Sequence, residues 1–315
     1  MLIPYFCIKQ QIMFRGLYSN LNPISKLFLL ITLVLSFMLF SALFGILILV
    51  PFYGSGITGI LSSPDFSDSS VITALKVIQI FNMAAGLLLP ALFYLWLSTP
   101  KEEKYTAFSL KVSPALVLSA IVLVIVAQPF IGWTSELNSY LSLPGWLAPV
   151  EEWMKGKEKI GADITEAFLA TTTAGGLTVN LLMIVVLPAF AEEVLFRGVL
   201  AKIIRDWTKS IHFAVLISAF IFAAIHLQFY GFLPRFLLGV AFGYLFFWSG
   251  SLWLPIAAHF TNNFLSVMVE FLFRKGIIHT NSDNFGMNNP LLLTVFSLAA
   301  VTAILYSMYR QTRQT

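Results

Sequence analysis

The sequence predicts an all-α, polytopic membrane protein. Hydrophobic residues make up 58% of its 315 positions, charged residues make up 11%, and the mean hydropathy is +0.85. Soluble domains contain about 25% charged residues, so this composition lies outside their range. The apolar residues also form long continuous runs, without the alternating ten-residue segments that are typical of a membrane β-barrel. Because a lipid-exposed backbone must satisfy its own hydrogen bonds, these runs are predicted to be helices.

About eight runs reach the length of roughly 20 residues that an apolar helix needs to cross a bilayer. In chain order they cover residues 25–50, 71–98, 113–133, 177–204, 211–229, 232–249, 252–273 and 290–309. The connections within 205–252 are short, which predicts that the fourth to seventh helices pack as sequential neighbours in a bundle of about eight transmembrane helices.

The runs divide the chain into four parts. We predict an N-terminal cytoplasmic tail at 1–24, three helices with a long loop at 25–176, a core of four helices at 177–273, and a last helix with its tail at 274–315.

The segment 134–176 is the longest between two runs and contains Trp146 and Trp153. Aromatic side chains of this kind are typical of membrane interfaces. One interpretation is therefore an interfacial helix or lid, and the other is a solvated loop. The stretch Thr-Thr-Thr-Ala-Gly-Gly at 171–176 is predicted to be a hinge into the fourth helix.

Lys and Arg residues beside the runs predict the orientation. Lys9 and Arg15 precede the first run and Lys26 lies at its start, whereas the loop at 51–70 contains no Lys or Arg. By the positive-inside rule, both termini of this integral, multi-pass protein are cytoplasmic, and we expect it in the inner cell membrane. Arg274 and Lys275 would then lie outside, against the rule. The charge of +4 forms no clustered basic face, so the expected partner is the bilayer and not nucleic acid; the oligomeric state is left open.

Cys7 is the single cysteine, which excludes an internal disulfide and a CxxC metal motif. It lies in the N-terminal tail, far along the chain from the histidines considered below, so a thiol nucleophile is not expected. Residues 1–8 are apolar but short, and no small-residue cleavage site precedes the first run. The first helix is therefore expected to act as its own insertion signal, and Met13 is an alternative start.

Three charges interrupt the fourth run, in the sequence Ala-Glu-Glu-Val-Leu-Phe-Arg-Gly at 191–198. A charge at the centre of a bilayer costs about 2.5–3.5 kcal/mol on insertion scales, so such residues usually face a cavity and mark function. Glu193 and Arg197 are four residues apart and are expected to pair on one helix face. Glu192 is rotated by roughly 100 degrees, so the two carboxylates should have different environments and roles. An ion network that only locks helices together is the alternative.

Polar residues also mark the fifth and seventh runs. Phe222 and His226 are four residues apart, as are His259 and Asn263. This spacing places the members of each pair on one face of a helix. Asn262 is a weaker candidate than Asn263, and a lone histidine in an apolar helix is more often a packing residue than a ligand. Three polar sets on neighbouring helices nevertheless predict one shared site.

Peptide hydrolysis inside a membrane needs a base for water and donors for the oxyanion. Glu192 and His226 suit the first task, and His259 and Asn263 suit the second. No Ser or Thr stands beside a His and a carboxylate as a nucleophile would. A zinc site with Glu192, His226 and His259 as ligands is the alternative, although the sequence has no HExxH motif. We expect no metal and no other cofactor.

The ordered motifs resemble a known family. Glu-Glu-x-x-x-Arg at 192–197, Phe-x-x-x-His at 222–226 and His-x-x-x-Asn at 259–263 follow one another on the fourth, fifth and seventh predicted spans. Ser-Leu-Trp-Leu-Pro-Ile at 251–256 leads into the last of them. This set resembles the CAAX-protease and bacteriocin-processing family of intramembrane glutamate endopeptidases, over about residues 177–270.

The resemblance implies a metal-independent endopeptidase in an eight-helix bundle, with a membrane-associated peptide or protein as substrate, lipidated or not. It assigns water activation to Glu192 and His226, the oxyanion hole to His259 and Asn263, and supporting roles to Glu193, Arg197 and Phe222.

Two other functions remain open for the same bundle. A non-catalytic scaffold or bacteriocin-immunity-type protein would bind a partner without needing Glu192. A proton-coupled transporter would titrate Glu192 and Glu193, but the first three runs lack the matching polar set that an internal repeat requires.

Helix lengths predict a conflict in depth between two of the site residues. His226 lies about 22 Å along a helix that starts at Ile211, whereas the charged end of the fourth run would bring Glu192 nearer the membrane face. Either the helices tilt and start outside the bilayer, or the predicted boundaries are wrong. Pro188 before Glu192 and Pro255 before His259 are positions where a bend would bring these residues level.

Overall fold

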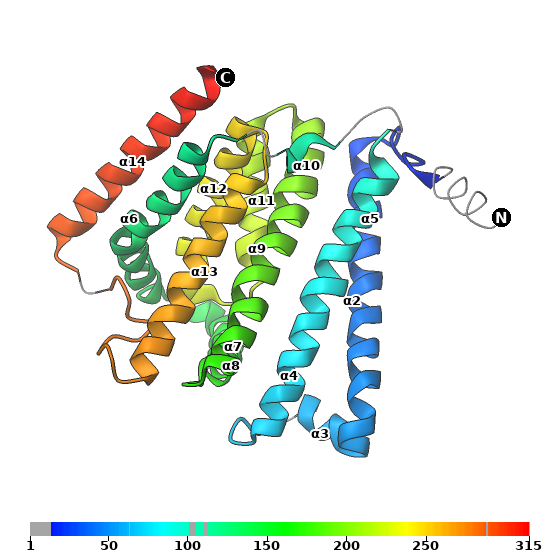
Figure 1. Ribbon diagram of the computed structural model, residues 1–315, viewed down its shortest axis with the longest axis vertical. Coiled ribbons are helices and arrows are strands. Elements are labelled where there is room, and N and C mark those ends of the chain that lie inside the picture. The colour runs from blue at the N-terminus through cyan, green and yellow to red at the C-terminus, as the bar shows by residue number, and fades with distance from the viewer. Residues whose placement is uncertain (1–13, 63, 101–104, 110–111, 288, 315) are drawn as a thin grey trace.

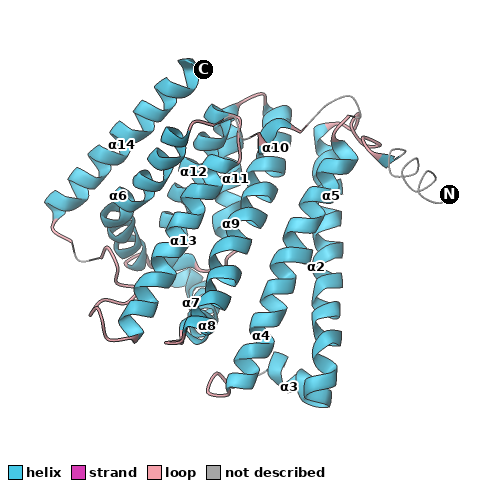
Figure 2. Ribbon diagram, in the orientation of Figure 1, coloured by secondary structure: helices cyan, strands magenta, loops and turns pink. Residues whose placement is uncertain are grey.

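The computed structural model describes residues 14–62, 64–100, 105–109, 112–287 and 289–314. Cys7 and Met13, to which predictions were attached, lie outside these ranges. All regular structure in the described residues is helical (Figure 2). The all-α prediction is therefore confirmed.

Seven helices in the described ranges are long and apolar enough to cross a membrane. They are α2 (Pro23–Tyr53), the continuous helix Ser69–Ser98, α6 (Pro114–Ser139), the continuous helix Ala174–Thr208, α12 (Phe232–Ser249), α13 (Trp253–Arg274) and α14 (Leu291–Gln314). Each follows one of the predicted runs. The protein is an integral, multi-pass membrane protein.

The fifth predicted run is shorter than expected. α11 (Ile211–Ala224) has 14 residues and spans about 21 Å. The predicted helix end at residue 229 was wrong, because Leu227 adopts a φ of 52° and Phe229–Gly231 forms a separate 3-10 turn. His226 therefore lies in a turn after the helix. With α11, the chain makes eight passes through the bundle.

The passes are antiparallel neighbours (Figure 1). α2 packs against the helix formed by α4 (Ser69–Phe81), a π-helical segment (Asn82–Leu88) and α5 (Leu89–Ser98) on one side of the bundle. α14 packs against α6 on the opposite side, and the remaining helices lie between these two pairs. α2 begins and α14 ends at the same end of the bundle.

The long segment before the fourth helix is itself helical. α7 (Ala148–Leu169) follows a 3-10 turn at Gly145–Leu147, so the interpretation as a solvated loop is wrong. The predicted hinge is the break between α7 and α8 (Ala174–Asn180), where the hydroxyl of Thr173 accepts a hydrogen bond from the amide of Gly176 at 3.1 Å. Thr173 thereby acts as the N-cap of the fourth long helix.

Two wide turns interrupt the fourth long helix. Its parts are α8, a π-helical segment at Leu181–Val186, α9 (Leu187–Glu192), a second π-helical segment at Glu193–Leu200, and α10 (Ala201–Thr208). Such π-helical turns occur frequently at functional sites. The second one begins at the residue after Glu192 and carries Glu193 and Arg197.

The helix ends remove the predicted conflict in depth. The fourth helix continues to Thr208, so Glu192 lies about 24 Å from that end. His226 lies about 22 Å from Ile211, where α11 begins at the same side. Glu192 and His226 are therefore at nearly equal depth.

Two glycines allow α11 and α12 to pack closely. A Cβ added at Gly239 would lie 3.0 Å from Cβ of Ala219, and one added at Gly243 would lie 3.0 Å from Cγ1 of Val215. The four-residue spacing of small residues is a common motif for close helix approach in membranes. This contact fixes the turn after α11, and with it His226, beside α12.

Candidate functional site

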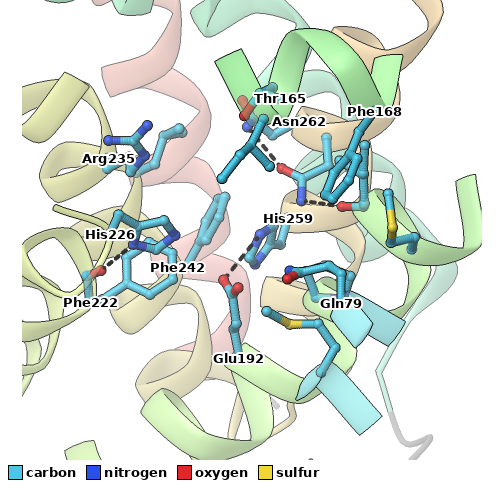
Figure 3. Close-up of a pocket in the computed structure, with 17 residues that line it drawn as sticks. Gln79, Thr165, Phe168, Glu192, Phe222, His226, Arg235, Phe242, His259 and Asn262 are labelled. Carbon is cyan, nitrogen blue, oxygen red and sulfur yellow. Dashed lines mark hydrogen bonds and ion pairs between the residues drawn. The ribbon is translucent and has the colours of Figure 1, made fainter. Parts of the chain in front are cut away.

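A cavity of about 340 Å³ lies among the central helices (Figure 3). Its polar lining includes Glu192 at the end of α9, His226 in the turn after α11, and His259 and Asn263 on α13. The structure thus brings four residues from three separate predicted runs to one cavity. Asn262 lines it as well.

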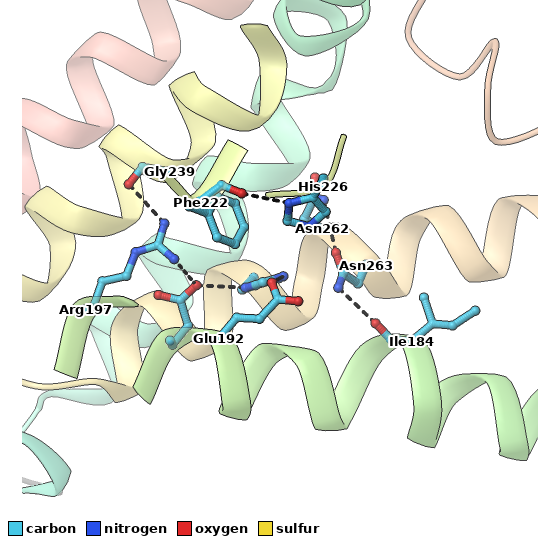
Figure 4. Close-up of polar contacts among 10 residues, drawn as sticks. Ile184, Glu192, Arg197, Phe222, His226, Gly239, Asn262 and Asn263 are labelled. Carbon is cyan, nitrogen blue, oxygen red and sulfur yellow. Dashed lines mark hydrogen bonds and ion pairs between the residues drawn. The ribbon is translucent and has the colours of Figure 1, made fainter. Parts of the chain in front are cut away.

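Glu193 and Arg197 form a buried ion pair behind this cavity. Nη1 of Arg197 donates to Oε1 of Glu193 at 2.8 Å, and the two side chains are 2% and 0% exposed. Arg197 also donates to the carbonyl oxygen of Gly239 at 3.1 Å, and its guanidinium lies 4.7 Å from the ring centroid of Phe222 (Figure 4). The expected pair is present, and the guanidinium ties α12 to the fourth helix.

His259 lies between the two carboxylates. Its Nδ1 is 2.8 Å from Oε1 of Glu193, and its Nε2 is 3.8 Å from Oε2 of Glu192. The first distance is that of a hydrogen bond, whereas the second is too long for one. Glu193 therefore orients the ring, while Glu192 faces the cavity. The difference in environment predicted for the two carboxylates is present.

The backbone orients His226. Its Nδ1 is 2.7 Å from the carbonyl oxygen of Phe222. A carbonyl only accepts hydrogen bonds, so Nδ1 carries the proton and Nε2 is the proton acceptor of the neutral ring. The ring of Phe222 meets His226 edge-on at 5.1 Å and His259 at 6.1 Å, and thus packs against both histidines.

The amide of Asn263 is held by the fourth helix. Its Nδ2 donates to the carbonyl oxygen of Ile184 at 2.9 Å, and its Oδ1 accepts from Nδ2 of Asn262 at 3.3 Å (Figure 4). An amide nitrogen carries two hydrogens, so one N–H of Asn263 serves this bond and the other remains for a ligand.

Sequence reasoning missed Arg235 on α12, which lines the same cavity. Its Nη1 donates to the carbonyl oxygen of Gln228 at 3.1 Å, and its Nη2 donates to the side chain of Gln228. Arg235 thereby holds the turn that carries His226. Arg235, like Glu192, is a charged residue in an apolar run, so the cost of a charge in the membrane marked both residues.

Parts of the chain outside the predicted core also line the cavity. Gln79 reaches it from α4, and α7 contributes Ile164, Thr165 and Phe168. The segment interpreted as a possible lid therefore covers one wall of the cavity. These contributions depend on how distant segments pack, and no local motif marked them.

The ligand set of the zinc alternative is not assembled. Among the residues that the structure describes, no three His, Cys, Asp or Glu side chains gather as a metal site requires. This holds for Glu192, His226 and His259, whose side chains meet the cavity from different walls (Figure 3).

Residues 174–265 match the family described as Rce1-like, type II CAAX prenyl endopeptidase. Over these residues the chain is similar to the Rce1-like family. The matched segment contains the paired glutamates, both histidines and Asn263. The resemblance predicted from the order of the motifs is therefore confirmed.

The chain also has a relative among bacterial proteins. The chain is 36% identical over 85 residues to an uncharacterized protein, YpbD, of Bacillus subtilis (strain 168). The matched part covers 26% of this chain and 40% of the relative's length. No solved structure matches the chain.

Proposed function

We propose that this protein is an intramembrane endopeptidase that hydrolyses peptide bonds of membrane-associated proteins or peptides. The observation that carries the proposal is that Glu192, His226, His259 and Asn263 line the same cavity. Two proton acceptors and the hydrogen-bond donors thus face one space, which is the set that acyl transfer to water requires. The Rce1-like match over the same residues supports the assignment.

In the proposed reaction, Glu192 and His226 activate the water. A water molecule that attacks the scissile carbonyl carbon loses one proton, which the carboxylate of Glu192 or Nε2 of His226 accepts. The same groups then return the proton to the leaving amine nitrogen as the C–N bond breaks. The tautomer set by the carbonyl of Phe222 leaves Nε2 of His226 suited to this role.

His259 and Asn263 stabilise the oxyanion that forms on the carbonyl oxygen. Asn263 donates its second N–H. Because Nδ1 of His259 already donates to Glu193, Nε2 donates to the oxyanion only when the ring is an imidazolium. Removing a single oxyanion donor typically lowers kcat by about 10²–10³-fold.

Replacement of Glu192 by Gln tests the proposal. The amide keeps the size of the side chain but cannot accept the proton, so cleavage should fall by at least about 10²-fold. The measurement is mass-spectrometric mapping of membrane-protein termini in cells that carry the wild-type protein or E192Q. Termini present only with the wild type identify the substrate as well.

Glu152→Gln is the matched control, because Glu152 is exposed on α7. It should give the wild-type set of termini. The same termini in E192Q cells, at equal protein level, would refute the role of Glu192. A phenotype that survives both E192Q and His226→Ala would instead favour the non-catalytic scaffold.

We also propose that the reaction needs no metal. The purified protein should keep its activity in 1,10-phenanthroline, because the base and the oxyanion donors are side chains. A loss of activity that only zinc restores would favour the zinc alternative, since its ligands would then assemble around the metal.

A further inference from the structure

A second polar cavity lies at the end of the bundle where α2 begins and α14 ends (Figure 1). It has a volume of about 330 Å³ and lies between α2, α5 and α10. Its charged lining residues in the described ranges are Lys26, Lys202, Arg205 and Asp206. The cavity is separate from the site of the proposed peptidase.

The positive charge of this cavity is only partly compensated. Arg205 and Asp206 form an ion pair at 2.6 Å. Neither Lys26 nor Lys202 has a carboxylate within ion-pair distance in the part of the chain that the structure describes. Among the described lining residues, Asp206 is the one carboxylate and is paired with Arg205, so two ammonium groups face the cavity without an ion-pair partner there.

Aromatic rings hold Lys202 at the wall of the cavity. Its Nζ lies 4.5 Å from the ring centroid of Tyr105 and 5.9 Å from that of Phe246. Tyr105 is itself fixed, because its hydroxyl donates to the carbonyl oxygen of Gly198 at 2.9 Å. The quadrupole of an aromatic ring attracts a cation over its face, so the two rings hold the ammonium group at this position. Lys202 is thus a positioned donor.

Hydroxyl groups complete the lining at the depth of lipid headgroups. Ser98 and Thr99 lie where the second long helix ends, Lys26 lies in the first turn of α2, and Lys202 lies in the last turns of the fourth helix. Basic pockets between helix ends are a typical environment for the headgroups of anionic lipids.

From this arrangement we infer that the cavity binds a phosphate group, either of an anionic lipid or of a soluble phosphate. Lysine ammonium groups and hydroxyls are the donors that phosphate oxygens accept. A phosphate bound there joins α10 to α2 and α5 through one ligand. The inference does not depend on the peptidase activity.

Native mass spectrometry of the full-length protein in detergent tests the lipid source. The protein is given phosphatidylglycerol or phosphatidylcholine, and retained lipid is counted by mass. We expect preferential retention of phosphatidylglycerol, a loss of about tenfold or more in its affinity in Lys202→Gln, and wild-type retention in Lys202→Arg. Arg310→Gln is the matched control, since Arg310 is exposed on α14 at the same end of the bundle.

Inorganic phosphate tests the soluble source. It should raise the melting temperature of the wild-type protein and of R310Q, but not that of K202Q. Either positive result supports the site and identifies its ligand. If K202Q melts early without ligand, Lys26→Gln takes its place in both assays. Equal retention of the two lipids together with no shift by phosphate overturns the inference, as does unchanged binding by both lysine variants.

Discussion

At the scale of single residues, the two adjacent glutamates differ in their partners. Glu193 is fully buried and accepts hydrogen bonds from Arg197 and His259 through one oxygen. Glu192 lines the cavity and touches His259 only at 3.8 Å. The carboxylate of Glu193 is occupied by two partners within the protein, whereas the carboxylate of Glu192 faces the cavity and is available to a ligand. Although the two residues are adjacent in one helix turn, Glu193 is therefore a structural ion and Glu192 is a candidate base.

Glu193→Gln should destabilise the protein strongly, because it leaves Arg197 as a buried charge without a counter-ion. Breaking a buried pair in this way typically costs about 3–5 kcal/mol. The measurement is the melting temperature in detergent. Lys155→Gln is the control, since it breaks an ion pair in which Lys155 is 62% exposed, and such pairs contribute about 0–1 kcal/mol. Equal shifts for the two variants would contradict the prediction.

At the scale of elements, the contact between α11 and α12 positions the turn with His226. Gly239 has two tasks there, because it allows the close approach of Ala219 and offers its carbonyl oxygen to Arg197. Arg235 and Asn138 fix the same turn from other sides: Arg235 donates to Gln228, and Nδ2 of Asn138 donates to the carbonyl oxygen of Phe229 at 2.8 Å.

Gly239→Val should separate α11 from α12 and move the turn. Overpacking of a tight contact typically costs about 1–3 kcal/mol, and the bond from Arg197 lengthens as the helices part. We expect a lower melting temperature and reduced cleavage. Gly156→Val, on α7, introduces the same side chain in a helix where a Cβ meets no atom within 4 Å. If the melting temperature and cleavage fall as much in G156V as in G239V, the effect comes from the low helix propensity of valine and not from the contact between α11 and α12.

The sequence predicted those parts of the site that depend on spacing within one helix. Glu193 pairs with Arg197 because residues four apart share a face, and His259 and Asn263 face one cavity for the same reason. The end of α11 was not predictable, because the apolar run continues past Ala224 and no Pro or Gly marks the break. The contribution of α7 depends on tertiary packing, which periodicity does not encode.

At the scale of the whole molecule, the eight helices that cross the bundle in the described ranges place the start of α2 and the end of α14 on one side (Figure 1). By the positive-inside rule, Arg274 would lie on the wrong side of the membrane, and its contacts explain this exception. It is paired with Glu270 at 2.7 Å and lies 3.6 Å from Glu166. Its charge is compensated within the protein, so it contributes little to the bias that sets topology.

Reporter tags at the two termini should therefore be digested together. In inverted membrane vesicles, an added protease should remove both tags, and in right-side-out vesicles it should remove neither, if the termini are cytoplasmic as the remaining charges predict. Removal of only one tag in either preparation would contradict the even number of passes.

The short helix α11 has a consequence for the surrounding lipid. Phe213 and Phe220 on this helix are 60% and 56% exposed, so α11 presents an apolar flank to the acyl chains. That flank is about 21 Å long, against a hydrocarbon thickness of about 30 Å, and the hydrophobic mismatch draws the headgroups inward beside it. We therefore expect water to reach the non-helical turn after Ala224 from a local depression in the membrane surface. A polypeptide lying along the lipid surface thereby approaches the depth of His226 without first crossing a full leaflet.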